Sequence, residues 1–535
     1  MKLFLFLTFV FSAAVNPMSG QASVTDLNAR YQSNVAQCSN GTPAYYCSGI
    51  LLRAVDYNAF FKFWDYGSQA TKLGSVAFTY IRSDVGSGAL NGNRKSGFIL
   101  KDQTSALAEN KAVNVRCIFP FPTESLDERA DHGCGFAPRM AQADPDLANC
   151  AKLAGSPTTA SAWLKNFKEH NSLPKNQCSL STVVATQFKA SLEAHKLVDA
   201  VWTAKPMEVL IQTWDESKPE KLPVEAVFYD VSTPAKLADA QKFQREYYLA
   251  TSLYLPIVRL DLGAPNQNVF SVSVSDQIYG QVVAEQLNAR YENVSETCAG
   301  KSAYFCNGVL IRVTKATISY HAWDPSRTSI ARNGVAFSYL RQDLQMARLY
   351  RGEVTGFVFK SLDMAAKADS YPTPVRCSFP FDGATDRRYM SCGRHDYFAG
   401  EGNSCMEMGI NTLAKWKGHY HAHDSRQYHQ CSLGPEPEQF SIFLKARNNF
   451  DHAADLNFPN EIVVAAWPVG IPKQLPLEAF FYVASPTGLA GAQYIQKDYF
   501  QQTGRYLPVI RLTIDDHVFN FSYHEGDQGV SSYGS

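Results

Sequence analysis

The 535-residue sequence lacks an excess of charge of either sign. Fifty lysine and arginine residues balance fifty aspartate and glutamate residues, which gives a formal net charge of zero. Proteins that bind nucleic acid phosphates or anionic membrane surfaces usually carry a basic excess. The charge balance therefore argues against a nucleic acid partner, and any anionic ligand has to be held by a local site.

The short motifs of several enzyme classes are also missing. The sequence has no G-x-S-x-G elbow, no H-E-x-x-H zinc motif, no P-loop and no convincing G-x-G-x-x-G fingerprint. No C-x2-C pair occurs, so the cysteines lack the usual spacing of a zinc site. The histidine-rich segment His419–Cys431 favours a polar loop, because only His423 has a counterpart, His170, elsewhere in the chain. We expect no bound metal and no cofactor.

Long apolar runs are confined to the N-terminus. Lys2 is followed by an apolar stretch from Leu3 to Val15 and by small residues up to Ala22. This pattern is typical of a secretory signal peptide, residues 1–22, and the stretch is too short to span a bilayer. No second run of about eighteen apolar residues follows. We expect a secreted, extracellular protein with no membrane span.

The twelve cysteines all follow this segment. An even number in an exported chain predicts disulfides. Several connectivities remain open from the sequence, and we favour bonds between neighbours because short loops close at low entropic cost. The favoured pairs are Cys38–Cys47, Cys117–Cys134, Cys150–Cys178, Cys298–Cys306, Cys377–Cys392 and Cys405–Cys431.

A long internal repeat organises the chain. "LNARYQSNVAQCSNGTPAYYCSGILLR" from Leu27 returns as "LNARYENVSETCAGKSAYFCNGVLIR" from Leu287, and "KLPVEAVFYDVS" from Lys221 returns as "QLPLEAFFYVAS" from Gln474. The period of ~250–260 residues far exceeds the ~20–50 residues of a solenoid unit. We expect two homologous domains, residues 23–277 and 278–535.

Each copy mixes strand and helix patterns. Runs such as "VAFSYLR" and "LEAFFYV" are rich in β-branched and aromatic residues and predict strands. The segments that begin at Ser23, Val183 and Glu438 predict helices, the last two because they space apolar residues by three and four. We expect an α+β fold in which each disulfide-stabilised domain has a mixed or mainly antiparallel sheet with flanking helices.

Two segments of the second copy carry candidate site residues. Arg312 lies in "VLIRV", where a guanidinium needs an anionic or carbonyl partner, so it is either a structural ion pair or a clamp for phosphate or carboxylate. In "YHAWDPS", Tyr320 and Trp323 can stack on a planar ring, while His321 and Asp324 can form hydrogen bonds to it. The alternative is a turn at Asp324 with Trp323 in the core.

Two further candidates are charged residues on predicted strands. Arg341 and Asp343 are two positions apart, which fits a local surface salt bridge as well as substrate binding. Glu478 heads a hydrophobic strand, so it is either ion-paired or catalytic. Arg312 and Glu478 facing one cleft would bind an anionic leaving-group donor and stabilise a positive sugar transition state.

At these segments the chain resembles the halovibrin family of secreted bacterial proteins. The likeness rests on "ARYENVSETCAGKSAYFCNGVLIR", "YHAWDPS", "GVAFSYLRQDL", "FPFDGATDRR" and "QLPLEAFFYV", and it spans essentially all of the second copy and, more weakly, most of the first. The family is associated with cleavage of NAD at the nicotinamide–ribose bond and with ADP-ribosyl transfer. The resemblance therefore implies a secreted enzyme with NAD as its substrate.

The resemblance also implies a role for each candidate. Arg312 would hold the pyrophosphate, and Trp323 or Tyr320 would stack on nicotinamide. His321 and Asp324 would orient the ribose, and Glu478 would stabilise the oxocarbenium-like transition state. The acceptor of ADP-ribose would be water or a host or competitor protein.

The first copy departs from this pattern where the candidates are densest. Lys62 stands in the place of His321 and Phe61 in that of Tyr320. Six other candidates have counterparts there: Arg53, Trp64, Asp65, Arg82, Asp84 and Glu225. We expect an active site in the second copy and an altered or inactive counterpart in the first. The alternative is an exported binding or adhesion module without catalysis, in which two copies provide avidity.

Overall fold

The fold is given by a computed structural model, which describes most of the chain. The described residues are 24–530 without 56–67, 86–89, 91–93, 124–128, 130, 136–148, 199–204, 216, 219–220, 264–267, 315–323, 345, 347–348, 350–353, 368–370, 396–403, 424–428 and 449–457. The expected signal peptide therefore lies outside the described residues. The described parts of the two copies can be compared element by element.

The first copy is built on one mixed sheet. Its strands are β1 (Ile50–Val55), β2 (Ser75–Ile81), β3 (Ser96–Leu100), β4 (Val115–Phe119), β5 (Leu180–Ser181), β6 (Met207–Gln212), β7 (Val224–Asp230), β8 (Ile257–Leu260) and β9 (Phe270–Ser271). They lie in the order β5-β4-β6-β2-β1-β3-β7-β8-β9. The strands β7 and β8 pair in parallel, and the other recorded pairs are antiparallel.

The second copy repeats this sheet. Its strands are β12 (Val309–Thr314), β13 (Val335–Leu340), β14 (Thr355–Phe359), β15 (Val375–Phe379), β16 (Glu461–Val464), β17 (Leu477–Val483), β18 (Val509–Asp515) and β19 (Val518–Tyr523). Their order, β15-β16-β13-β12-β14-β17-β18-β19, matches that of the first copy from β4 to β9. Again one pair, β17 with β18, is parallel. The internal repeat in the sequence is thus a repeat of topology.

Helices cover both faces of each sheet. In the first copy they are α1 (Val24–Gln32), α2 (Ser68–Leu73), α3 (Gln103–Ala108), α4 (Ala160–Glu169), α5 (Ala185–Lys196) and α7 (Lys236–Thr251). In the second they are α8 (Tyr279–Glu292), α9 (Arg327–Ala331), α10 (Leu362–Lys367), α11 (Leu413–Ala422), α12 (Pro437–Asn448) and α13 (Pro486–Thr503). The helix α13 joins the parallel strands β17 and β18. It begins at an N-cap, Ser485, whose side chain accepts from Gly488 N, and ends at Gly504 with φ of 65°.

The second sheet has a core on each face. On one face, which we name the α12 face, Phe440 and Phe443 of α12 pack with Leu310 and Phe480. On the other, the α8 face, residues of α8 such as Leu287 pack with strand residues such as Ile311 and Ala479. Because side chains alternate along a strand, neighbouring strand residues separate onto these two faces.

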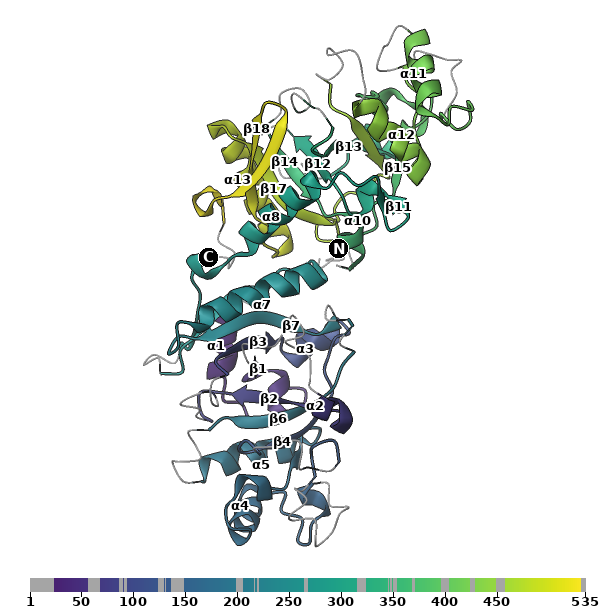
Figure 1. Ribbon diagram of the computed structural model, residues 1–535. Coiled ribbons are helices and arrows are strands. Elements are labelled where there is room, and N and C mark those ends of the chain that lie inside the picture. The colour runs from purple at the N-terminus through teal and green to yellow at the C-terminus, as the bar shows by residue number, and fades with distance from the viewer. Residues whose placement is uncertain are drawn as a thin grey trace, which may run out of the picture.

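The helix α7 of the first copy joins the two domains. It lies between the two sheets in Figure 1, and its Tyr248 is 1% exposed and belongs to the core of the α8 face of the second copy. Arg245 of α7 donates to Glu285 of α8 across 2.6 Å. The ring of Tyr254 also lies 5.7 Å from that of Tyr506. The second domain therefore completes one of its cores with residues of the first.

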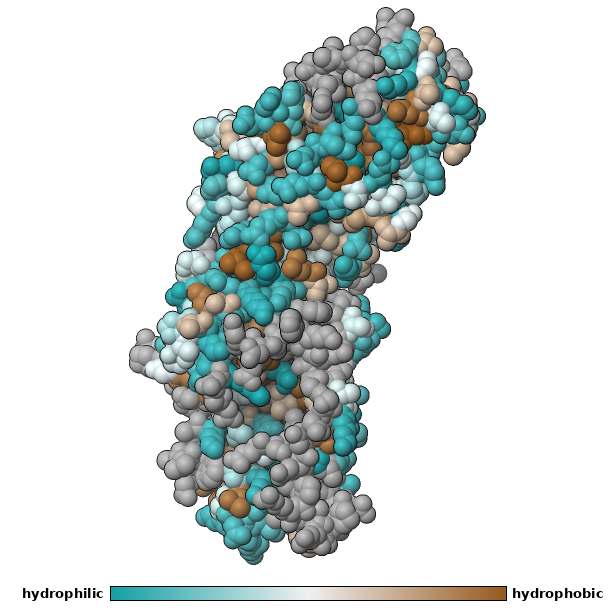
Figure 2. Space-filling model, viewed as in Figure 1, coloured by the Kyte–Doolittle hydropathy of each residue, from teal (hydrophilic) through white to brown (hydrophobic). Residues whose placement is uncertain are grey.

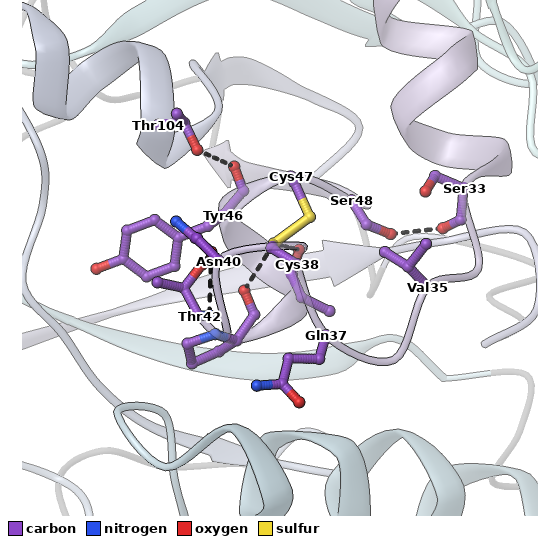
Figure 3. The surroundings of a disulfide bond; sticks show 12 residues. Ser33, Val35, Gln37, Cys38, Asn40, Thr42, Tyr46, Cys47, Ser48 and Thr104 are labelled. Atoms are coloured by element: carbon purple, nitrogen blue, oxygen red, sulfur yellow. Dashed lines mark hydrogen bonds between the residues drawn. A yellow bond between two sulfur atoms is a disulfide. The ribbon is translucent and has the colours of Figure 1, made fainter.

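Six disulfides link neighbouring cysteines, three in each copy, as expected. Figure 3 shows the first of them, between Cys38 and Cys47, which closes the loop after α1. Two hydrogen bonds hold this loop to its surroundings: the Thr104 hydroxyl donates to Tyr46 O over 3.1 Å, and the Ser48 hydroxyl donates to Ser33 O. The cross-links stabilise each copy separately, because no bond joins one copy to the other.

The visible surface is mainly hydrophilic. Apolar residues are scattered among hydrophilic ones on the face drawn in Figure 2. Large exposed apolar side chains such as Leu107, Val183 and Tyr389 belong to different elements. Among the described helices, none is long and apolar enough to cross a membrane.

The predicted α+β class with a mixed sheet and flanking helices is confirmed. The helices predicted from Ser23, Val183 and Glu438 correspond to α1, α5 and α12. The sequence patterns did not predict α7 and α13, whose apolar residues are interrupted by glutamine and charged side chains. Both helices nevertheless form because each packs a narrow apolar stripe on its own sheet.

Candidate functional site

Arg312 occupies the α12 face of β12. Its neighbours Leu310 and Ile311 belong to the cores of the α12 face and the α8 face, so alternation places Arg312 with Leu310. Its half-buried guanidinium donates from Nη1 to Ala336 O, the carbonyl of the adjacent strand β13, over 2.9 Å. The first copy does the same: Arg53 donates to Ala77 O over 2.9 Å. This bond holds the fork of each arginine in one orientation.

Asp324 is tied to the loop that follows β16. Its Oδ1 accepts from Gly470 N over 3.2 Å. In the same loop, the buried Trp467 packs its ring 6.3 Å from Phe337 and 5.7 Å from Phe359. The Nε1 donor of Trp467 is buried and has no hydrogen-bond partner within the described part of the chain.

These contacts converge at one corner of the second sheet. Val335 at the start of β13 pairs with Val464 at the end of β16. Arg312 reaches the next residue of β13, Ala336, and Asp324 reaches the loop that continues from Val464. We call this region, defined by Arg312, Asp324 and Trp467, the β13 corner.

Several expected site residues lie outside the described residues. They are Tyr320, His321 and Trp323 in the second copy and Trp64 and Asp65 in the first. The structure therefore does not test their proposed contacts.

The chain matches no family model and no curated protein.

Glu478 is fully buried in an ion-pair cluster at the junction of the two copies. Its carboxylate accepts from the Nη2 group of Arg290 on α8, and its Oε1 accepts from the hydroxyl of Tyr248 over 2.7 Å. The side chain of Glu478 is 0% exposed and that of Arg290 is 8% exposed. Burial, reinforced by the charge of Glu478, raises the pKa of Tyr248 well above its ordinary value, so this hydroxyl stays a donor.

Glu478 and Arg312 lie on opposite faces of the sheet, which corrects the expectation that they face one cleft. Strict alternation from Phe480, in the core of the α12 face, would place Glu478 on that face as well. A β-bulge interrupts the register there: Val358 pairs with Ala479 and Phe359 with Leu477, so Glu478 is the extra residue of β17. The bulge turns Glu478 to the α8 face, where Arg290 and Tyr248 hold it.

Glu225, the first-copy counterpart of Glu478, is also ion-paired. Its Oε2 accepts from Arg30 over 2.5 Å, and Arg30 also bonds Asp26 over 3.0 Å. The acidic residues of the two "LP-x-E-A" segments therefore share one structural partner, an arginine of the first helix of each copy. In the second copy, the residue that corresponds to Asp26 is Gln286, so Glu478 is the carboxylate on which Arg290 depends.

Lys360 completes the junction cluster. Its Nζ is buried and donates to Ser252 O of the first copy over 2.6 Å. Burial lowers the pKa of Lys360 to about 8, against the opposing effect of the Glu478 charge. The contact links the end of β14 to the end of α7.

Arg341 and Asp343 form an ion pair in which the arginine is buried, instead of the expected surface salt bridge. Arg341 is 1% exposed; it donates to both carboxylate oxygens of Asp343 over 2.6 Å and to Ser295 O over 3.0 Å. In the first copy, Arg82 bonds Asp84 and Val35 O in the same way. The arginine is buried because it fastens the segment after the first helix to the sheet, so this pair supports the fold of both copies.

The sequence reasoning missed a second buried carboxylate, Glu461. Its oxygens accept from Gly383 N over 2.8 Å and from the Thr385 hydroxyl over 2.7 Å. Burial and the nearby charge of Asp382 raise the pKa of Glu461 to about 8. A signal existed in the repeat, since Glu461 begins "EIVVAAW" and Glu208 begins the matching "EVLIQTW".

The histidine-rich segment contributes helix caps where it is described. The ring Nδ1 of His423 lies 2.7 Å from His419 O at the end of α11, and that of His170 lies 2.7 Å from Asn166 O at the end of α4. Within the described residues, no three His, Cys, Asp or Glu side chains form a group that could hold a metal ion.

Proposed function

We propose that the protein is a secreted enzyme that cleaves NAD at the nicotinamide–ribose bond, releasing nicotinamide and ADP-ribose, and that the β13 corner of the second copy is its site. One observation supports this assignment most. An oriented guanidinium, Arg312, and a half-buried carboxylate, Asp324, are both tied to this corner. The resemblance to the halovibrin family indicates which bond such a pair would cleave, the nicotinamide–ribose bond of NAD.

The chemistry of the bond requires two charges of opposite sign near the substrate. The arginine fork suits the pyrophosphate of NAD, because it forms two parallel hydrogen bonds to oxyanions. A carboxylate near the ribose stabilises the positive charge that develops as nicotinamide leaves. With Glu478 on the opposite face, Asp324 takes the role of this carboxylate, and Glu478 serves the junction between the copies.

The proposal is tested by incubating the purified full-length protein with NAD and measuring free nicotinamide. We expect release above the background of NAD alone, and we expect Asp324→Asn to lower kcat by about 10²-fold as an electrostatic contact of the transition state is lost. A protein that releases no nicotinamide would refute the proposal. Labelled ADP-ribose on a host or competitor protein, instead of free in solution, would identify a transferase.

One observation favours a second candidate, an exported binding module with two equivalent copies. Arg53 and Arg312 make the same hydrogen bond to the adjacent strand, which indicates a role common to both domains. Two equal sites would provide avidity for a repeated target. This candidate predicts binding of NAD or another phosphate ligand by both copies, with no turnover.

A further inference from the structure

The first copy contains a cavity of about 260 Å³ at the edge of its sheet. It lies between β4, β5 and the loop that ends at Cys134. Two disulfides, Cys117–Cys134 and Cys150–Cys178, cross-link its walls or the residues next to them. A cavity with walls fixed in this way is formed before a ligand arrives, which lowers the cost of binding.

Donor groups line the cavity on one side. Arg116 is the extra residue of a β-bulge in β4, where the pairing with β6 shifts between Val115 and Cys117. Arg116 lines the cavity as a half-buried residue, and its buried Nε has no hydrogen-bond partner among the residues that the structure describes. Asn149 also lines the cavity; its Oδ1 accepts from Ala151 N, so its Nδ2 is the group that it can offer to a ligand.

Acceptor groups line the cavity on the side of the loop. Asp131 and His132 line the cavity there, and both residues are exposed. The Nδ1 of His132 lies 3.1 Å from Leu73 O and must donate to this carbonyl. In the neutral ring Nε2 is then an acceptor.

The side chains of Asp131 and His132 occur in the first copy alone, whereas the conformation of their loop occurs in both copies. Asp131 and His132 have φ of 52° and 54°. The corresponding loop of the second copy, before Cys392, has two residues with φ of 50° and 62°, Met390 and Ser391. The backbone geometry is therefore a feature of the fold, whereas the carboxylate and the imidazole are additions of the first copy.

We infer that this cavity binds a small zwitterion of the amino acid class, whose carboxylate pairs with Arg116 and whose ammonium group pairs with Asp131 and with Nε2 of His132. The cavity offers one cation and one carboxylate, which complement a ligand that carries both charges. A plain anion would leave Asp131 facing like charge, and a plain cation would leave Arg116 unpaired. The inference does not depend on NAD cleavage, since it concerns a different copy and a different edge of the sheet.

The test is calorimetric titration of the full-length, disulfide-intact protein with each of the common free amino acids. We expect saturable 1:1 binding of at least one of them. Removing its ammonium charge by N-acetylation, or its carboxylate by amidation, should weaken binding about tenfold or more, as loss of a charge-assisted pair does.

Three variants locate the binding site. Arg116→Gln and Asp131→Asn should each weaken binding about tenfold or more. The matched control is Arg376→Gln, which changes the corresponding arginine before Cys377 in the second copy and should leave binding unchanged. Asp131 is exposed, so Asp131→Asn tests the site even if Arg116→Gln perturbs folding.

Three outcomes would overturn the inference. The first is that no free amino acid binds at millimolar concentration. The second is that inorganic phosphate binds as tightly as the best amino acid, which would indicate a simple anion site. The third is that Arg376→Gln weakens binding as much as Arg116→Gln does.

Discussion

Replacing Glu478 by glutamine separates its structural role from a catalytic one. The substitution leaves Arg290, which is 7% exposed, without its carboxylate partner, and it changes the acceptor of the Tyr248 hydroxyl. Breaking a buried ion pair on one side costs about 3–5 kcal/mol. We therefore expect the free energy of unfolding to fall by roughly this amount, measured by denaturant titration of the second domain's transition.

Glu225→Gln is the matched control. Arg30 keeps a second carboxylate, Asp26, at 3.0 Å, so the loss of stability should be smaller, about 1–2 kcal/mol. Tyr248→Phe removes only the hydroxyl and should cost about 1 kcal/mol. Because Tyr248 and Glu478 are in direct contact, the double variant should lose less stability than the sum of the two single variants.

Nicotinamide release by the folded fraction decides between the roles. If Glu478 holds the junction of the two copies, the folded Glu478→Gln protein retains kcat to within a few-fold of the parent. If kcat instead falls by about 10²-fold or more while stability is unchanged, Glu478 acts in the reaction and the structural interpretation is refuted.

Three further predictions concern other parts of the second copy. His321→Lys, which gives the second copy the lysine found in the first, should lower nicotinamide release strongly without changing the unfolding midpoint, and unchanged release would show that His321 is dispensable. The pKa of Glu461 is about 8 in the folded protein and about 4 in the unfolded chain. Its contribution to stability is therefore full below about pH 4 and is lost as pH rises through about 8. Glu461→Gln should flatten this fall of the unfolding free energy with pH, and an unchanged pH profile would contradict the assignment. Gly308→Ala places a Cβ within 2.3 Å of the Tyr339 ring at a φ of 63°, so we expect a loss of at least about 2 kcal/mol in thermal unfolding, and a neutral effect would show that the ring moves aside.

Local patterns predicted most of the fold. The apolar, β-branched runs became strands because period-two burial is encoded in neighbouring residues. The disulfides joined neighbouring cysteines, as expected from short loops. By contrast, α7 and α13 carry weak apolar stripes, and their packing depends on contacts with distant strands.

The environment of Glu478 could not be predicted from local sequence. Its partner Arg290 is 188 residues away and its partner Tyr248 belongs to the other copy. A one-residue bulge decides which face it occupies, and a bulge leaves no clear signature in a hydrophobic run. Arg341 posed a related problem, because spacing predicted its partner, Asp343, but not its burial under the segment after α8.

The comparison of the two copies is more informative than either copy alone. The features that both share, such as the ion pairs Arg341–Asp343 and Arg82–Asp84, identify what the fold requires. The features that differ, such as Asp131 and His132 in one copy, identify what each domain has added. Together they indicate two domains of one architecture whose side chains differ at particular sites.

The most direct test of the proposed function is nicotinamide release by the parent protein, Arg312→Gln and Arg53→Gln under the same conditions. The two substitutions remove the same guanidinium from the same position of each copy, so they cost the fold about equally. We predict release by the parent protein, a fall of about 10²-fold in kcat/KM for Arg312→Gln, and parental activity for Arg53→Gln. No release by the parent, or an equal fall in both variants, would contradict an active NAD-cleaving site at the β13 corner.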